Sequence, residues 1–525
     1  MVTTKRDTRG FERAAEQAAM ALKRAKRVLV VGHIDADGIT ASSIASAALH
    51  REGVEHTVRF VKKLDEAEIA RINAYEADLV WLVDLGSGSF SRLDPSKVVV
   101  TDHHRPDPSA SRIKVDLFSF AAHHVNPHLY GMDGSAEISG AGTAYAVAKA
   151  MDPRNRDLAP LAIIGAVGDF QDNSESRLIG YNRTILEDAV STGLLRAEID
   201  LRLFGRETRP LHALIQFSTD PALLPVLRST QAAFRRADCA DDEDNMLCME
   251  FLRSMEVETK EGDRWRSWNR LGLEEKRRVA SELCRRLLDC GKGTATVRRL
   301  VGEVYCLAPG LPGTPPLWKV DELGPEIGAG GGTWHPNARA LMDAKEFATL
   351  LNACGRHDRP EVGKAVCLGD RGEALAEALR NQDSHRESLK RAIRLVKEGG
   401  ENGIREDACC PSLRYFHGQD LIEDTIVGIV AGMLLGSPEV PSDRPLFAFA
   451  QASDGTCTLK VSARGTRDLV RRGLDLSAVM RVASESVGGS GGGHNIAAGA
   501  TIPEGTEKAF LTKANEQIQK QLTDP

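Results

Sequence analysis

Residues 28–38 read VLVVGHIDADG, an apolar run that ends abruptly in a cluster of acidic and imidazole side chains. The stretch 11–27 before this run is amphipathic, and helical spacing resumes over 39–50. The same alternation of apolar runs and helical pattern continues at 57–61, 66–74, 78–85 and 97–101. Short β-branched runs that alternate with helices predict an α/β fold with a parallel sheet covered on both faces.

The length of 525 residues is too great for one core and predicts two to four domains. The middle of the chain changes character, with Trp265, Trp268 and Trp318, an acidic patch at 238–244 and the sequence PGLPGTPP at 309–316. From 443 onward the pattern predicts a small α/β domain. We therefore expect a parallel-sheet catalytic domain, an insertion or partner-binding module, a helical connector that continues the core, and a smaller C-terminal substrate-binding domain, at 1–200, 201–335, 336–430 and 431–525.

Composition and charge narrow the class of protein. The chain is 42% hydrophobic and 27% charged, and no apolar run approaches the roughly 20 residues that span a bilayer. The basic N-terminal stretch lacks a signal-peptide core, so we expect a cytoplasmic protein without a membrane partner. Its ten cysteines are scattered without a C-x-x-C pair, which argues against structural zinc. The net charge of −6 disfavours a protein that merely coats nucleic acid.

Carboxylates and imidazoles follow four of the apolar runs. They are His33, Asp35 and Asp37, then Asp84, then Asp102, His103 and His104, and finally Asp169. In parallel sheets ligands gather beyond the carboxyl ends of the strands, so these side chains are expected to meet. Alternation along an extended 33–37 segment would point His33, Asp35 and Asp37 to one side.

The ligand types indicate the metal. Oxygen and imidazole nitrogen suit Mn²⁺ or Mg²⁺, and a two-metal site needs a bridging carboxylate between ions about 3.5–4 Å apart. Any single member of the set could instead be a helix cap or a satisfied core residue, but that explanation is implausible for all eight together. The sequence therefore predicts a centre for two divalent cations.

Four motifs resemble those of the DHH phosphoesterase superfamily. HIDADG is similar to the first motif, VDLG to the second, TDHH to the third and AVGD to the fourth. GGSGGGH at 488–494 and Ser462-Ala-Arg464 resemble the DHH-associated C-terminal domain. Longer stretches, such as 139–152 and 350–371, resemble archaeal RecJ-like proteins that include the GINS-associated nuclease.

The resemblance implies a role for each matching residue. His33 and Asp35 would bind one metal ion, Asp37, His103 and Asp169 the other, and Asp84 would bridge them. His104 would face the phosphate, and Asp102 would orient a histidine or the backbone. The nucleotide beside the scissile bond would be held by Ser462, Arg464, Gly491, Gly492, Gly493 and His494. Manganese is the expected metal, with magnesium as the alternative.

The resemblance implies a single-strand exonuclease acting on DNA or RNA in replication or repair, with GINS and the replicative helicase as candidate partners. A phosphodiesterase for oligoribonucleotides or cyclic dinucleotides, and a replication scaffold, stay open as alternatives. A pyrophosphatase is more distant. Three histidines near the site, His123, His124 and His128, could line it or be satisfied loop residues. The sequence leaves the polarity of digestion open.

Overall fold

The computed structural model describes residues 6–107, 123–230, 240–308, 336–435, 437, 440–453 and 456–523. It divides into two compact units, Met1–Gln382 and Asp383–Pro525. Residues 309–316 and Trp318 lie outside the described residues, as does part of the acidic patch at 238–244. No helix in the described ranges is long and apolar enough to cross a membrane.

The first unit is built on a sheet of five parallel strands in the order β2–β1–β3–β4–β5. Their bounds are Glu55–Val61, Arg27–His33, Leu79–Val83, Val98–Thr101 and His123–Val125. Alternate residues of β1 enter different cores: Val28 and Val30 join one, Leu29 and Val31 the other. Burial on both faces explains why the strand is apolar throughout.

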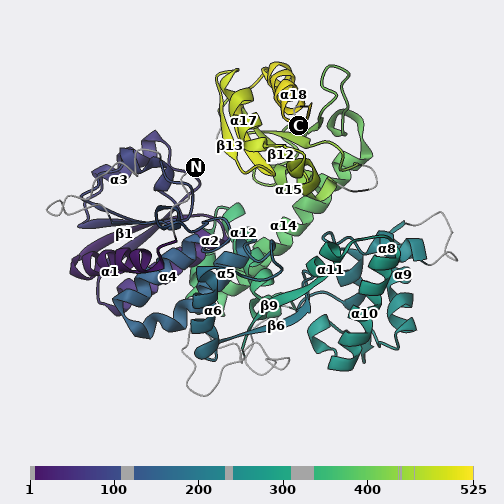
Figure 1. The fold of residues 1–525 in the computed structure, drawn as a ribbon, viewed down its shortest axis with the longest axis horizontal. Coiled ribbons are helices and arrows are strands. Elements are labelled where there is room, and N and C mark those ends of the chain that lie inside the picture. The colour runs from purple at the N-terminus through teal and green to yellow at the C-terminus, as the bar shows by residue number, and fades with distance from the viewer. Residues whose placement is uncertain are drawn as a thin grey trace. The chain divides into compact units, whose positions relative to one another are not determined.

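Helices cover both faces of this sheet (Figure 1). The larger core packs the sheet against α1 (Thr8–Arg24), α2 (Ala36–Arg51), α4 (Gly140–Met151), α5 (Ala159–Gly168) and α12 (Ala344–Arg356). The smaller core packs it against α3 (Glu66–Ala74) and the 3-10 helix Ser87–Arg92. The predicted α/β fold with a parallel sheet is confirmed.

One local prediction is wrong. Residues 33–37 are not extended, because β1 ends at His33 and α2 begins at Ala36. Asp35 is the N-cap of α2, and its side chain accepts a hydrogen bond from Gly38 N at 3.0 Å. Capping satisfies an otherwise orphan helical N–H group, which favours the turn over continued extension. Asp37 therefore lies in the first turn of a helix.

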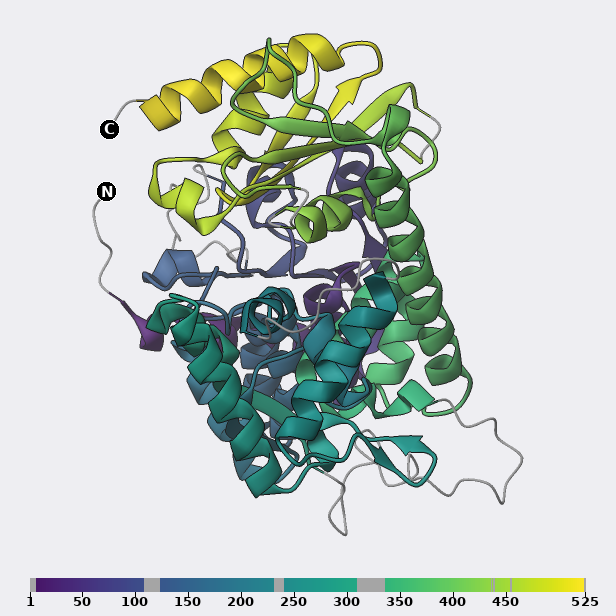
Figure 2. The same cartoon turned by 90° about the vertical axis from the view of Figure 1, so that its right-hand side faces the viewer.

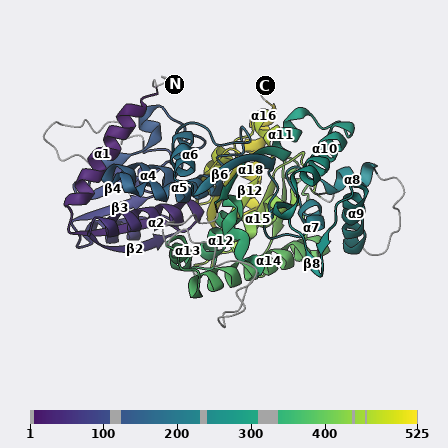
Figure 3. The ribbon, with the colours of Figure 1, turned by 90° about the horizontal axis from the view of Figure 1, so that it is seen from below.

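A helical module follows the parallel sheet within the first unit. After α6 (Tyr181–Ser191), the strands β6 (Leu195–Leu201) and β9 (Val301–Leu307) form an antiparallel pair. Between them lie α7 (Leu211–Gln216), α8 (Leu224–Thr230), α9 (Ala240–Ser254), the two-residue strands β7 (Lys260–Glu261) and β8 (Arg264–Trp265), α10 (Leu273–Asp289) and α11 (Thr294–Leu300). The helices α8, α9 and α10 gather apart from β2–β4 (Figure 1, Figure 3). They share a core of their own around Phe251 and Trp268.

The chain then passes through α13 (Pro360–Cys367) and the long helix α14 (Glu373–Glu398), drawn in green in Figure 2. The second unit has a mixed sheet in the order β10–β11–β12–β14–β13. These strands span Arg414–His417, Leu446–Gln451, Thr458–Arg464, Ala497–Pro503 and Ser490–Gly493. Its helices are α15 (Val427–Leu434), α16 (Arg467–Arg471), α17 (Leu476–Glu485) and α18 (Glu507–Thr523). The exact edges predicted for the four domains stay predictions.

Candidate metal centre

The carboxyl ends of the parallel strands bring the predicted residues together. His33 is the last residue of β1, Asp84 follows β3, and Asp102 follows β4. Asp169 is the C-cap of α5. Asp84 has a left-handed backbone (φ 60°), a strained conformation of the kind found at functional sites.

Three groups of three candidate ligands form at this edge, and one of them, Asp84, His103 and His104, shares Asp84 and His103 with the other two. The other two contain the six predicted metal ligands. In the first, one atom each of His33, Asp35 and Asp84 lies within 4.8 Å of the others. In the second, Asp37, His103 and Asp169 do the same. Asp84 joins the groups, because its Oδ2 lies 3.7 Å from His33 Nδ1 and its Oδ1 lies 3.3 Å from His103 Nε2. All six predicted metal ligands therefore converge on one place.

The second group is held by α4 and the loop before it. The oxygens of Asp37 accept hydrogen bonds from Gly140 N at 2.6 Å and Ala141 N at 3.0 Å, at the start of α4. A Cβ at Gly140 would lie 2.4 Å from Asp84 Oδ1, so only glycine permits this approach. His103 Nδ1 donates to Gly134 O at 2.6 Å, which leaves Nε2 directed at Asp84 and Asp169. This second hydrogen bond is the usual support of a metal-binding imidazole.

Asp102 is buried and orients the residues after β4. Its Oδ1 accepts hydrogen bonds from His103 N, His104 N and His104 Nδ1 at 2.8, 3.1 and 2.8 Å. Its Oδ2 accepts from Ser87 N at 2.8 Å. The His104 side chain is half exposed, so its ring is fixed at Nδ1 while its other edge stays accessible.

A further layer of polar residues supports this arrangement. Ser87 Oγ lies 2.8 Å from His124 Nε2 and accepts a hydrogen bond from Asn126 Nδ2 at 2.7 Å. The same amide donates to His104 O at 2.8 Å. Burial lowers the pKa of His124 to about 4, which keeps the ring neutral. His124 is thus linked to His104 indirectly, through Ser87 and Asn126.

Burial and mutual repulsion dominate the electrostatics. Burial, then the neighbouring Asp169 and Asp35, raise the pKa of Asp37 to about 6. Burial and the charges of Asp37 and Asp35 raise the pKa of Asp84 well above its ordinary value. Burial alone would lower the pKa of His33, but the adjacent Asp35 raises it to about 9. The carboxylates therefore gather excess negative charge, which raises the pKa of the imidazole beside them and which a bound cation would offset.

Orphan polar atoms show what would offset that charge. His33 Nδ1, Asp84 Oδ1 and His103 Nε2 are buried and complete no hydrogen bond in the described part of the chain, although His33 Nδ1 lies 2.8 Å from Asp35 Oδ2 and the other two atoms lie 3.3 Å apart. Buried polar groups are nearly always paired, so three orphans in one cluster indicate a missing ligand. Carboxylate oxygens and imidazole nitrogens without a thiolate fit a hard or borderline divalent cation. The residues present thus fit a metal centre.

Residues at the end of α12 contact the turn that carries Asp35, and no role was predicted for them. Asn352 Oδ1 accepts a hydrogen bond from Ala36 N at 2.9 Å, and a Cβ on Gly355 would lie 1.8 Å from Ile34 O. Arg356 is partly buried, which lowers the pKa of its guanidinium, and the charge of Asp35 opposes that shift. These residues lie in the stretch NACGR at 352–356, whose resemblance to RecJ-like proteins was the available signal.

The six predicted nucleotide-binding residues all lie in the second unit. Ser462 and Arg464 lie on β12, which is hydrogen-bonded to β14. Gly491, Gly492 and Gly493 form β13 at the edge of the sheet, and exposed His494 follows them. The glycine run is thus an edge strand that pairs with β14 on one side. A Cβ at Gly491 would meet α17 at 2.8 Å, whereas Gly492 has open space.

Three family models match successive parts of the chain. The DHH family N-terminal domain matches residues 27–166, the DHH-CID domain residues 203–301 and the DHHA1 domain residues 413–520. An uncharacterised protein of Methanocaldococcus jannaschii is 26% identical over 500 residues, which cover 94% of each chain. The single-stranded-DNA-specific exonuclease RecJ of Thermus thermophilus is 27% identical over 212 residues, which cover 38% of this chain and only 30% of RecJ.

Solved structures share the fold. Exonuclease RecJ bound to manganese superposes with a TM-score of 0.51 at 17% identity, covering 99% of this chain and 96% of RecJ. CDC45 from Entamoeba histolytica superposes with a TM-score of 0.56 at 11% identity, covering 97% of each chain. With DHH, DHH-CID and DHHA1 domains in this order, the chain is a DHH-family protein that resembles RecJ.

Proposed function

We propose that the protein is a metal-dependent exonuclease that hydrolyses phosphodiester bonds of single-stranded nucleic acid by a two-metal mechanism, in DNA replication or repair. The observation that carries this proposal is the pair of three-ligand groups joined by Asp84, with His104 beside them. Similarity to single-stranded-DNA-specific exonucleases supports the reaction, although the alignments cover less than a third of those enzymes.

His33, Asp35 and Asp84 would hold one cation, and Asp37, His103 and Asp169 the other, with Asp84 between them. Manganese is the first expectation and magnesium the alternative, since both accept this donor set. When bound, the cations lower the pKa of water and neutralise charge on the attacking and leaving oxygens. Asp37 and Asp84 are buried among other carboxylates, and the bound cations would balance their negative charge.

His104 would act on the phosphate directly. Its Nδ1 is held by Asp102, whose pKa lies below its ordinary value: burial alone would raise it, and the adjacent His104 and His103 outweigh that. With Nδ1 bonded to Asp102, Nε2 is the nitrogen left to contact a phosphate oxygen or to pass a proton to the leaving group. Asp102 would serve as the residue that fixes the ring.

The second unit would supply the remaining contacts. Ser462, Arg464, Gly491, Gly492, Gly493 and His494 are proposed to hold the nucleotide next to the scissile bond. An arginine and a strand edge with one open glycine face suit a phosphate and its sugar. GINS and the replicative helicase are the proposed protein partners, on the resemblance to the GINS-associated nuclease.

Labelled strands test the proposal. Single-stranded DNA and RNA, each labelled at either end, are incubated with Mn²⁺ and then with chelator. We expect stepwise shortening from one end that stops with chelator and is absent in Asp84→Asn. Internal cuts, or digestion that survives chelation, would contradict the proposal. A length series separates the phosphodiesterase alternative, which predicts that only very short strands are processed.

The fold shared with CDC45 favours a scaffold as the second candidate. Asp84→Asn distinguishes the two functions, because it removes a central ligand and leaves the surface unchanged. A pull-down with GINS and the helicase is therefore paired with the cleavage assay. Retained partner binding with lost cleavage would establish both roles, whereas partner binding by a wild-type chain that cleaves nothing would leave the scaffold alone.

A further inference from the structure

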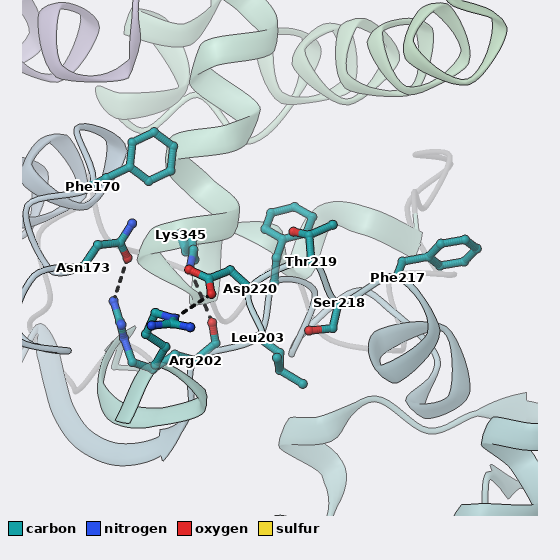
Figure 4. Close-up of a pocket in the computed structure, with 11 residues that line it drawn as sticks. Phe170, Asn173, Arg202, Leu203, Phe217, Ser218, Thr219, Asp220 and Lys345 are labelled. Carbon is teal, nitrogen blue, oxygen red and sulfur yellow. Dashed lines mark hydrogen bonds and ion pairs between the residues drawn. The ribbon is translucent and has the colours of Figure 1, made fainter. Parts of the chain in front are cut away.

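A pocket of about 210 Å³ lies within the first unit, where the parallel sheet meets the helical module. We call it the junction pocket. It is lined by Phe170 from the loop after α5, Arg202 after β6, Phe217 and Asp220 after α7, Arg299 from α11 and Lys345 from α12, among others. Phe170 and Phe217 stand on opposite sides, with Arg202, Asp220 and Lys345 between them (Figure 4). Phe170 directly follows the predicted metal ligand Asp169.

The pocket has more positive than negative charge. Arg202 pairs with buried Asp172, and Arg299 Nε lies 2.8 Å from Oδ1 of Asp220, whose side chain is 63% exposed. Lys345 is left over: Nζ donates to Arg202 O at a long 3.4 Å, and no carboxylate of the described chain forms an ion pair with it. Burial lowers the pKa of Lys345.

Unsatisfied donors show that an acceptor is missing. Arg202 is 6% exposed, yet its Nε has no hydrogen-bond partner in the part of the chain that the structure describes. A buried guanidinium with an open donor is costly unless a ligand completes it. Arg202 and Lys345 therefore give the pocket two cationic groups with which an anion could pair. Phosphate is the anion that arginine and lysine pockets commonly bind.

Exposed aromatic rings stand beside these donors. Phe170 and Phe217 are 63% and 60% exposed, so neither ring contributes much to a core. Phe170 also has a left-handed backbone (φ 57°), which a bulky residue adopts only at an energetic cost. Aromatic rings beside cations are the pattern that binds single strands, since every base has a face on which a ring can stack.

We infer that the junction pocket binds a nucleotide of the single strand, with its phosphate on Lys345 and Arg202 and its base stacked on Phe217 or Phe170. Pockets for whole small molecules measure roughly 300–1,000 Å³, so this smaller one suits a phosphate and sugar with the base at the rim. The inference rests on the proposed function and adds to it a strand contact outside the metal centre. Strands long enough to reach the pocket would therefore bind more tightly than short strands.

Strand binding tests the inference without cleavage. Fluorescence anisotropy is measured with labelled oligothymidylates of increasing length on the full chain, in chelator. Phe217→Ala should weaken binding of long strands about tenfold at unchanged salt dependence. Lys345→Gln should also weaken it and should lower the slope of log affinity against log salt by about 0.7. Binding of the shortest strands should not change in either variant.

Matched controls come from the same module. Leu273→Ala removes an exposed apolar side chain and Arg277→Gln an exposed cation on α10, and both should bind all strands as the wild type does. Unchanged long-strand binding in Phe217→Ala and Lys345→Gln would overturn the inference. So would equal weakening for every length, or a preference for free thymidine monophosphate over the strand.

The inference and the proposed function can fail separately. Cleavage with normal strand binding by the two variants would remove the junction pocket and keep the exonuclease. A wild-type chain that cleaves no strand, but whose long-strand binding falls in both variants, would keep the pocket and remove the exonuclease.

Discussion

Asp102 shows how a residue can govern the site without being one of the predicted ligands. We expect Asp102→Asn to place an amide where the carboxylate now accepts hydrogen bonds from Ser87, His103 and His104. The His104 ring would lose its fixed orientation, so turnover should fall roughly 10–100-fold, as for other residues that support a metal site. Cleavage rates and calorimetric Mn²⁺ titration check this. Mn²⁺ affinity as low as in Asp84→Asn would show that Asp102 is a ligand instead.

The types of the site residues could be predicted from sequence, because most of them follow apolar runs that end at one edge of a parallel sheet, and Asp169 follows the apolar helix α5. Their local conformation could not. Asp35 could either continue β1 in an extended conformation or cap α2. Only the structure shows that it caps the helix. Lys345 gave no local signal either, since its environment is made by segments far away in the chain.

At the scale of elements, α12 packs its backbone against the turn that carries Asp35. Gly355→Ala would place a Cβ 1.8 Å from Ile34 O, and neither backbone can yield easily. We expect a loss of about 1–3 kcal/mol in unfolding free energy, as for overpacked cores, together with weaker Mn²⁺ binding. Urea unfolding measures the first. Gly293→Ala is the control, since its Cβ meets nothing within 4 Å. Wild-type stability and metal affinity in Gly355→Ala would contradict this account.

The start of α12 also carries a pH-sensitive group. Burial, then the charge of Asp343, raise the pKa of Glu346 from 4.5 to about 8. Between these values the folded chain holds a proton that the unfolded chain has lost, so stability falls as pH rises from 4.5 through 8. Glu346→Gln can keep the acceptor for Glu207 N, at 2.8 Å, without titrating. Unfolding midpoints from pH 5 to about 8 should therefore slope downward less in the variant; parallel slopes would refute the assignment.

At the scale of the whole molecule, the two units have separate cores and should unfold in separate transitions. All six predicted ligands lie in the first unit, so Mn²⁺ should raise only that transition. At a hundredfold excess over Kd the stabilisation is about 2.7 kcal/mol. Scanning calorimetry of the full chain measures it, with Asp84→Asn as the variant that should not respond. A shift of both transitions would argue against a site confined to the first unit.

The sheets of the two units could be predicted from the sequence better than the pockets on their surfaces. The parallel sheet follows from β-branched runs alternating with helices. The runs after 443 indicated a small α/β domain, but not that its sheet is mixed or that β10 at Arg414–His417 belongs to it. The junction pocket could not be foreseen, because Phe170, Phe217 and Lys345 come from distant segments and each alone is unremarkable. The glycine run forms the edge strand β13 because it pairs with β14, a partner that the run's own sequence does not indicate.

The central claim is that side chains from the ends of β1, β3, β4 and α5 hold two cations together. An anomalous difference map from crystals soaked in Mn²⁺ tests it most directly. We expect two peaks about 3.5–4 Å apart with Asp84 between them, one beside His33 and Asp35 and the other beside Asp37, His103 and Asp169. A map without a peak at these side chains, or with a single peak away from Asp84, would contradict the account.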